Sequence, residues 1–147
     1  MTSNPAPIQP EAKAAAAPVV AKVPSSNGKV VLIVEDERPL SHALEMKLKN
    51  QGYTTHVSTN GAEALAELKT GKYDIVLLDL IMPVMDGFAL LTEMQKAKIK
   101  LPSIVLSNLG QDEDREKTKK LGAIDYMVKA NTPIVQIVDR VNKQLLS

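Results

Sequence analysis

Five short apolar runs alternate with five segments of helical periodicity along most of this chain. The clearest run is Ile75–Leu78, four branched apolar residues in a row, which fits a strand that is buried on both faces. The predicted strands are 30–34, 53–57, 75–78, 102–106 and 124–128, and the predicted helices are 39–50, 60–71, 86–94, 112–121 and 133–145. Strands that alternate with helices form a parallel sheet with helices on both faces. Five such units are too few for an eight-stranded barrel, so the sequence predicts an open, doubly wound α/β sheet.

Three helix starts carry recognisable capping residues. Asn60 is followed three residues later by Glu63, which resembles a capping box. Asp86 is predicted to begin the third helix. Thr132 stands directly before Pro133, which predicts an N-cap and a proline at the first helical position.

Residues 1–28 differ from the rest of the chain in composition. They hold five of the nine prolines and a run of four alanines, so a long helix is blocked and little apolar surface is available for a core. A signal peptide is the competing interpretation, but no basic segment precedes an uninterrupted apolar one. The sequence therefore predicts a flexible Ala/Pro-rich tail over residues 1–28 and one folded domain over residues 29–147.

Composition excludes several classes of protein. The chain has 18 basic and 17 acidic residues; without the two lysines and one glutamate of residues 1–28, each count is 16, which argues against a general nucleic-acid surface. The absence of cysteine excludes disulfides and thiolate metal sites. No apolar stretch approaches the roughly 20 residues that span a bilayer. We expect a cytoplasmic protein that binds neither DNA nor a membrane.

Polar residues end four of the five predicted strands. They are Glu35, Asp36 and Glu37 after the first strand, Asp79 after the third, Ser107 and Asn108 after the fourth, and Lys129 after the fifth. Because the carboxyl ends of parallel strands share one edge of the sheet, we expect these side chains to meet in one cleft. Crowded carboxylates repel one another unless a cation joins them, and Mg²⁺ is the hard, oxygen-binding ion that suits such a set.

A carboxylate, a divalent ion and a lysine together support phosphoryl transfer onto the carboxylate. That chemistry depends on positioning and on neutralisation of charge. Asp79 is the candidate nucleophile, Lys129 would hold a phosphoryl oxygen through a charge-assisted hydrogen bond, and the Ser107 hydroxyl could bond another.

These residues resemble the receiver domain of bacterial response regulators. The motifs that carry the resemblance are Val34-Glu35-Asp36, Asp79-Leu80-Ile81-Met82-Pro83-Val84-Met85-Asp86-Gly87, Ser107 and Tyr126-Met127-Val128-Lys129. They follow the family's order and spacing over residues 29–147. The resemblance implies a flavodoxin-like (βα)5 fold, as in CheY, with strand order 2-1-3-4-5.

The resemblance also implies a role for each site residue. Asp79 would accept a phosphoryl group from a sensor histidine kinase or a histidine phosphotransfer protein. Mg²⁺ would be bound by Asp36 and Asp79 directly, by Glu35 through water and by the backbone carbonyl of Ile81. Ser107 and Tyr126 would rearrange together as the switch, and Lys129 would contact the phosphoryl group.

The predicted function is that of a switch without turnover, and so not an enzyme. Phosphorylation adds negative charge at the rim and would bias the face formed by the helix 112–121, the strand 124–128 and the last helix. The chain stops at Ser147 directly after that last helix, so we expect a single-domain regulator whose output is a downstream protein partner.

Three positions depart from the family's pattern. Ala130 follows Lys129 where the family usually has proline after a cis peptide bond, and a cis bond before alanine costs roughly 3 kcal/mol. Ile81 and Leu109 are apolar where polar residues often position a hydrolytic water. These two residues predict a long-lived phosphoryl group on Asp79.

Three alternatives remain open on sequence alone. A haloacid-dehalogenase-like phosphatase also uses an aspartate after a strand, but it needs a second aspartate two residues on, where this chain has Ile81. A flavodoxin-like FMN binder would need a hydroxyl- and glycine-rich loop where this chain has Glu35-Asp36-Glu37. A degenerate receiver would act as a binding module without phosphorylation, and Ala130 keeps that interpretation open.

Overall fold

The computed structural model describes residues 26–146, which form a three-layer α/β domain. The elements are β1 (Val30–Val34), α2 (Arg38–Asn50), β2 (Thr54–Ser58), α3 (Gly61–Leu68), β3 (Ile75–Leu78), α4 (Gly87–Lys96), β4 (Ser103–Ser107), α5 (Asp112–Lys120), β5 (Asp125–Val128), the short 3-10 helix η2 (Lys129–Asn131) and α6 (Ile134–Leu146). The predicted flexible tail lies outside the described residues, apart from 26–28. No helix within residues 26–146 combines the length and apolarity needed to span a bilayer.

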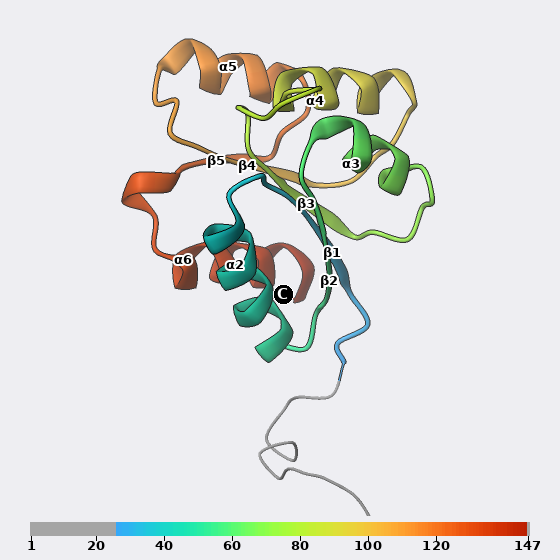
Figure 1. The fold of residues 1–147 in the computed structure, drawn as a ribbon, viewed down its shortest axis with the longest axis vertical. Coiled ribbons are helices and arrows are strands. Elements are labelled where there is room, and N and C mark those ends of the chain that lie inside the picture. The colour runs from blue at the N-terminus through green and yellow to red at the C-terminus, as the bar shows by residue number, and fades with distance from the viewer. Residues whose placement is uncertain (1–25, 147) are drawn as a thin grey trace, which may run out of the picture.

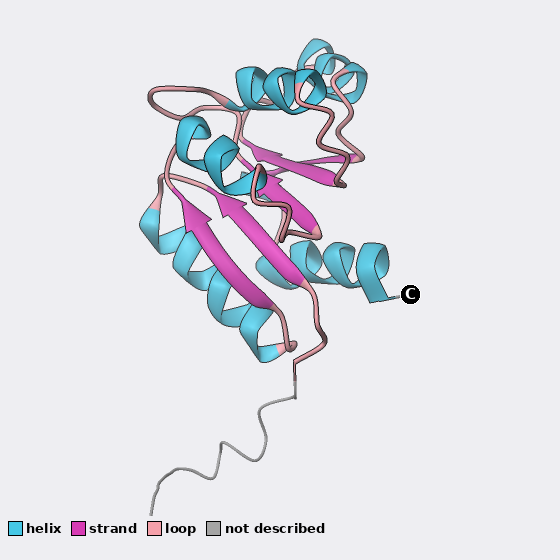
Figure 2. Ribbon diagram, turned by 90° about the vertical axis from the view of Figure 1, so that its right-hand side faces the viewer, coloured by secondary structure: helices cyan, strands magenta, loops and turns pink. Residues whose placement is uncertain are grey.

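The five strands are parallel and lie in the order β2-β1-β3-β4-β5. All arrowheads point the same way in Figure 2, so the carboxyl ends of the strands share one edge. Helices α3, α4 and α5 cover one face of the sheet, and α2 and α6 cover the other (Figure 1). The predicted fold class and strand order are confirmed.

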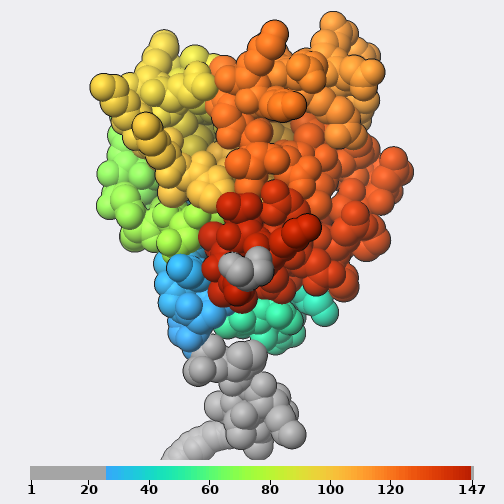
Figure 3. Space-filling view, turned by 180° about the vertical axis from the view of Figure 1, so that it is seen from behind, coloured from blue at the N-terminus to red at the C-terminus, as the bar shows by residue number. Residues whose placement is uncertain are grey.

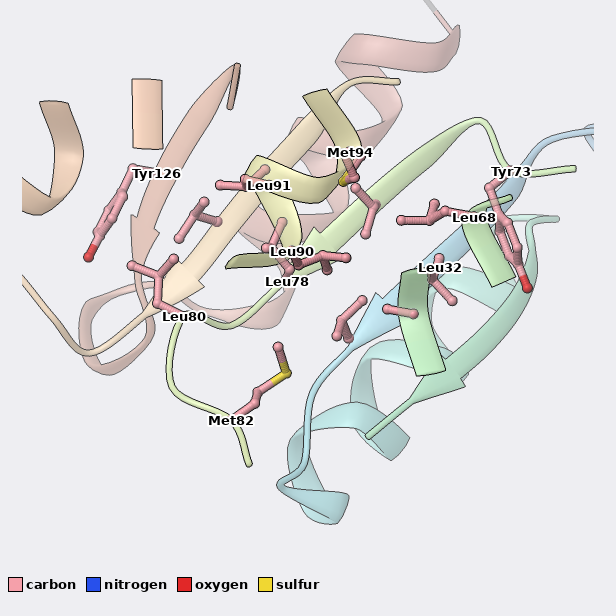
Figure 4. Close-up of a cluster of buried hydrophobic side chains, with 14 residues drawn as sticks. Leu32, Leu68, Tyr73, Leu78, Leu80, Met82, Leu90, Leu91, Met94 and Tyr126 are labelled. Carbon is pink, nitrogen blue, oxygen red and sulfur yellow. The ribbon is translucent and has the colours of Figure 1, made fainter. Parts of the chain in front are cut away.

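Alternation along each strand builds two apolar cores. Leu32, Val76 and Val105 point toward α3 and α4, where they join the cluster drawn in Figure 4. Their neighbours in sequence point toward α2 and α6 and pack against residues such as Leu44 and Val141. Because β3 faces a helix layer on both sides, all four of its residues are buried.

The element bounds differ from the predicted ones by a few residues. β2 and β4 each begin and end one residue later than predicted, so Ser107 is the last residue of β4. α3 ends at Leu68, before Gly71, because the backbone turns there with Gly71 at φ 79°.

Asn60 and Asp86 cap their helices as predicted, whereas Thr132 does not. Asn60 Oδ1 accepts a hydrogen bond from Glu63 N at 3.0 Å, and Asp86 Oδ1 accepts one from Ala89 N at 2.8 Å. The Thr132 hydroxyl instead donates to the Val128 carbonyl at 2.8 Å. That carbonyl belongs to the last residue of β5, and the short η2 turn that separates β5 from α6 leaves Thr132 four residues from it.

Val84 is held in a backbone conformation that is unfavourable for a β-branched residue. Its φ is 67°, and Met85 N donates to Pro83 O at 2.7 Å, which closes a tight three-residue turn with Val84 at its centre. The side chain is 84% exposed, so its packing contacts offset little of the cost of this backbone conformation.

We therefore expect Val84→Gly to stabilise the domain by about 1 kcal/mol, as strain relief exceeds the greater chain entropy of glycine. The measurement is urea denaturation. Val135→Gly is the matched control, because Val135 is an exposed valine within α6, where glycine should lower stability by about 0.5 kcal/mol. A loss of stability in Val84→Gly would contradict the strain argument.

Candidate functional site

Three carboxylates meet at the carboxyl ends of β1 and β3. Val34 and Leu78 are register partners on these neighbouring strands, so the residues that follow them emerge side by side. Glu35, Asp36 and Asp79 each place one oxygen within 4.8 Å of the others. Glu35 and Asp79 are buried and Asp36 is exposed. This arrangement has the spacing that a shared cation requires.

Lys129 brings an ammonium group into the same cluster. Its Nζ lies 2.8 Å from Glu35 Oε1, 2.9 Å from Asp79 Oδ2 and 3.2 Å from Glu37 Oε1. Burial acts to lower the pKa of Lys129, but the contacts with Glu35 and Asp79 outweigh it and raise this pKa above its usual value. The lysine is therefore protonated at neutral pH. Glu37, which the resemblance did not assign to the site, contributes the most exposed of the three contacts.

Glu35 carries the strongest sign that the cluster has room for a further cation. Its side chain is almost fully buried, and burial raises the pKa of its carboxyl group. One oxygen, Oε2, accepts a hydrogen bond from Glu37 N at 3.1 Å. The other, Oε1, is an ion-pair partner of Lys129 but accepts no well-directed hydrogen bond from the described residues. A buried oxygen with spare lone pairs beside two more carboxylates fits the ligand set of Mg²⁺.

The loop after Asp79 is held in place by two glycines. A Cβ on Gly87 would lie 2.4 Å from the Asp79 carbonyl oxygen and 2.8 Å from Leu80 Cα. Gly61, at the start of α3, donates its N–H to Met85 O at 2.9 Å, and a Cβ there would lie 2.5 Å from that oxygen. The sequence motif contains Gly87 but gives no sign that either glycine is a point of backbone contact.

Ser107 and Tyr126 both bond to the backbone of Leu109. Ser107 is fully buried, and its Oγ accepts a hydrogen bond from Leu109 N at 3.2 Å. The Tyr126 hydroxyl donates to Leu109 O. Burial raises the pKa of Tyr126, with the nearby Ser107 hydroxyl opposing the shift, so the phenol stays protonated and able to donate. The two predicted switch residues are thus linked through one short loop.

The Lys129–Ala130 bond is trans, as are all peptide bonds in the described residues. Ala130 N donates to Asn108 Oδ1 at 3.0 Å, which ties the loop after β5 to the loop after β4. The departure at Ala130 therefore alters this loop. Sequence reasoning placed Asn108 at the rim but did not foresee this bond.

One pocket gathers the residues of the rim. It is lined by Asp36, Glu37, Asp79, Ile81, Ser107, Asn108 and Lys129. The Ile81 side chain is 59% exposed at its edge, and its N–H donates to Asp79 Oδ1 at 3.3 Å. Tyr126 lies further back, in the core beneath α5, with the Arg115 guanidinium 4.8 Å from its ring centre.

This fold and this acidic rim define a signalling module of the receiver class, and residues 31–142 match the family of response regulator receiver domains. The chain belongs to that family. It is 34% identical over 99 residues to the cell cycle response regulator CtrA of Brucella ovis, an alignment that covers 67% of this chain and 43% of that protein. The aligned part thus spans less than half the length of the curated relative.

Solved receiver domains have the same fold. The receiver domain of the Francisella response regulator 1452 is 33% identical, with a TM-score of 0.74 over 78% of this chain and 94% of that one. The phosphorylated cyanobacterial phytochrome response regulator RcpA is 26% identical, with a TM-score of 0.73 over 81% of this chain and 94% of that one. The BeF3-activated receiver domain of Klebsiella pneumoniae RstA is 25% identical, with a TM-score of 0.73 over 81% of this chain and all of that one.

Proposed function

We propose that Asp79 accepts a phosphoryl group and that this modification switches a protein-binding face. The observation that carries the proposal is the contact of Lys129 Nζ with Asp79 Oδ2 at 2.9 Å, inside a group of carboxylates spaced for a shared cation. The ammonium marks the place where a phosphoryl oxygen would be held. The donor would be a sensor histidine kinase or a histidine phosphotransfer protein.

The chemical step is a displacement at phosphorus. A carboxylate oxygen of Asp79 forms a bond to the phosphorus of phosphohistidine as the bond from phosphorus to the imidazole nitrogen breaks. The imidazole leaves with the electron pair of that bond. Lys129 meets the charge of the transferred group through a charge-assisted hydrogen bond.

Glu35, Asp36, Asp79 and the Ile81 carbonyl would hold Mg²⁺. When bound, the ion neutralises phosphoryl oxygens and the crowded carboxylates. Glu35 fits this role because its buried Oε1 has lone pairs to spare, and Asp36 fits because its exposed side chain can turn toward the ion.

The output face would be reached through Ser107 and Tyr126. Both residues hold the Leu109 backbone, so a move of Ser107 toward the phosphoryl group changes the hydrogen bonding of the loop that leads into α5. The segments after this loop, α5, β5 and α6, form a continuous surface in Figure 3 (orange to red). We propose this surface as the binding face for a downstream protein partner.

The single-domain organisation and the cytoplasmic location stay predictions of the sequence, as does the absence of DNA binding. The long lifetime of the phosphoryl group, which Ile81 and Leu109 predict, also stays a prediction of the sequence. The phosphatase alternative gains no support from the site, because the apolar Ile81 side chain stands where that chemistry needs an acid. Release of p-nitrophenol from p-nitrophenyl phosphate with turnover would reinstate it.

The test is intact-mass spectrometry after incubation with phosphoramidate, which needs no partner protein. With Mg²⁺ we expect the mass of one phosphoryl group to be added. With EDTA in place of Mg²⁺ we expect the unmodified mass. Unmodified protein under both conditions would favour the degenerate-receiver alternative.

A further inference from the structure

Asn108 is oriented by a hydrogen bond that a proline at position 130 could not make. Ala130 N lies 3.0 Å from Asn108 Oδ1, across 22 residues of sequence. The backbone N–H is only a donor, so it must face the oxygen of the amide and not the nitrogen. The Asn108 Nδ2 group is thereby placed at the other end of the planar amide, away from Ala130 N.

The Nδ2 group is an unused donor at the pocket. Among residues 26–146 it donates to no protein group within hydrogen-bond distance. Asn108 is exposed and lines the same pocket as Asp79 and Lys129. Because the amide oxygen of Asn108 is held by Ala130 N and its Nδ2 group has no partner in the described part of the chain, the side chain is preorganised to donate to an acceptor that enters this pocket.

A phosphoryl group on Asp79 would find few other donors. Lys129 has three N–H groups, and Glu35, Glu37 and Asp79 already surround its Nζ at 3.2 Å or less. Ser107 Oγ accepts a hydrogen bond from Leu109 N, so its O–H can donate one hydrogen bond to the phosphoryl group. The transferred group carries between one and two negative charges and three acceptor oxygens, so it can accept hydrogen bonds beyond those of Lys129 and Ser107 and beside the proposed Mg²⁺.

We propose that Asn108 is a phosphoryl-binding residue, with Ala130 N–H as the group that sets its orientation. This inference rests on the proposed function of Asp79. It also gives the departure at position 130 a physical role, because alanine retains the N–H that orients the amide.

The competing role is a loop-to-loop tie with no contact to the phosphoryl group. The two roles differ in their response to Asn108→Asp. Aspartate keeps an oxygen for Ala130 N–H, so a simple tie would be preserved. It replaces the Nδ2 donor with an anionic oxygen, so binding of an anion would be opposed.

The experiment measures binding of beryllofluoride, a noncovalent stand-in for the phosphoryl group, to the full chain at saturating Mg²⁺. The half-saturating concentration is followed by fluorine NMR and by the rise in melting temperature. We expect Asn108→Ala to weaken binding about tenfold, the loss of one hydrogen bond to a charged group. We expect Asn108→Asp to weaken binding further. Asn131→Ala, in the same loop as Ala130 but outside the pocket lining, should bind as the wild type does.

Two results would overturn the inference alone: wild-type affinity in Asn108→Ala, or affinity at or above wild type in Asn108→Asp. Failure of the wild-type protein to bind beryllofluoride would overturn the proposed function and this inference with it. The matched titration of Mg²⁺ without beryllofluoride should give the same affinity for Asn108→Ala and wild type, because the amide is not among the proposed metal ligands.

Discussion

Asp79→Asn is expected to abolish addition of a phosphoryl group from phosphoramidate in the presence of Mg²⁺. The amide is not nucleophilic at its nitrogen or oxygen under these conditions, and it removes one of the three carboxylates that lie within 4.8 Å of one another. Intact-mass spectrometry would show only the unmodified mass. The effect is the largest predicted for the site, because no other side chain replaces the attacking oxygen.

Asp86→Asn is the matched control for this experiment. Asp86 stands seven residues after Asp79 in the same loop, but its side chain caps α4 through Ala89 N at 2.8 Å. Asparagine caps helices about as well as aspartate, so both the fold and the labelling should persist. Full labelling of Asp79→Asn would show that another residue is the acceptor.

Gly87→Ala is expected to destabilise the domain by about 3 kcal/mol. Gly87 is the first residue of α4, where alanine is the better helix former, so helix propensity alone predicts the opposite sign. The steric effect dominates because the added Cβ would lie 2.4 Å from the Asp79 carbonyl oxygen, and that backbone is fixed by its bond from Asp79 N to Val34 O at 3.0 Å. Urea denaturation measures the change.

The control for Gly87→Ala is Gly110→Ala. A Cβ at Gly110 would meet nothing within 4 Å, and its φ is not in the left-handed region. The Gly110→Ala variant should be slightly more stable than the wild type, because alanine lowers the conformational entropy of the unfolded chain. Equal stability of the two variants would show that the β3–α4 loop is free to move away from the new methyl group. In that case slower labelling of Asp79 would still reveal the displaced loop.

Much of the fold could be predicted from local patterns. The run Ile75–Leu78 identifies a strand with helices on both sides, since each of its residues must find an apolar environment. The rule that parallel strands end on one edge then places Asp36, Asp79 and Lys129 together without any knowledge of distances. Capping was predicted correctly for Asn60, whose partner lies three residues on. It was wrong for Thr132, whose hydroxyl bonds the carbonyl of Val128 at the end of β5.

The sequence by itself determined the order of the elements and the set of groups at the rim, because strand periodicity and the direction of a parallel sheet depend only on neighbouring residues. Only the tertiary structure decided which of these groups make contact. Lys129 contacts Asp79 and Glu37, which lie 50 and 92 residues away in sequence. Ala130 N bonds Asn108 Oδ1, and the missing side chain of Gly87 leaves room for the Asp79 carbonyl oxygen. Such contacts depend on how the whole sheet and its helices pack. A shift of about one ångström between two elements would form or remove a hydrogen bond, although the apolar pattern of the sequence would be the same.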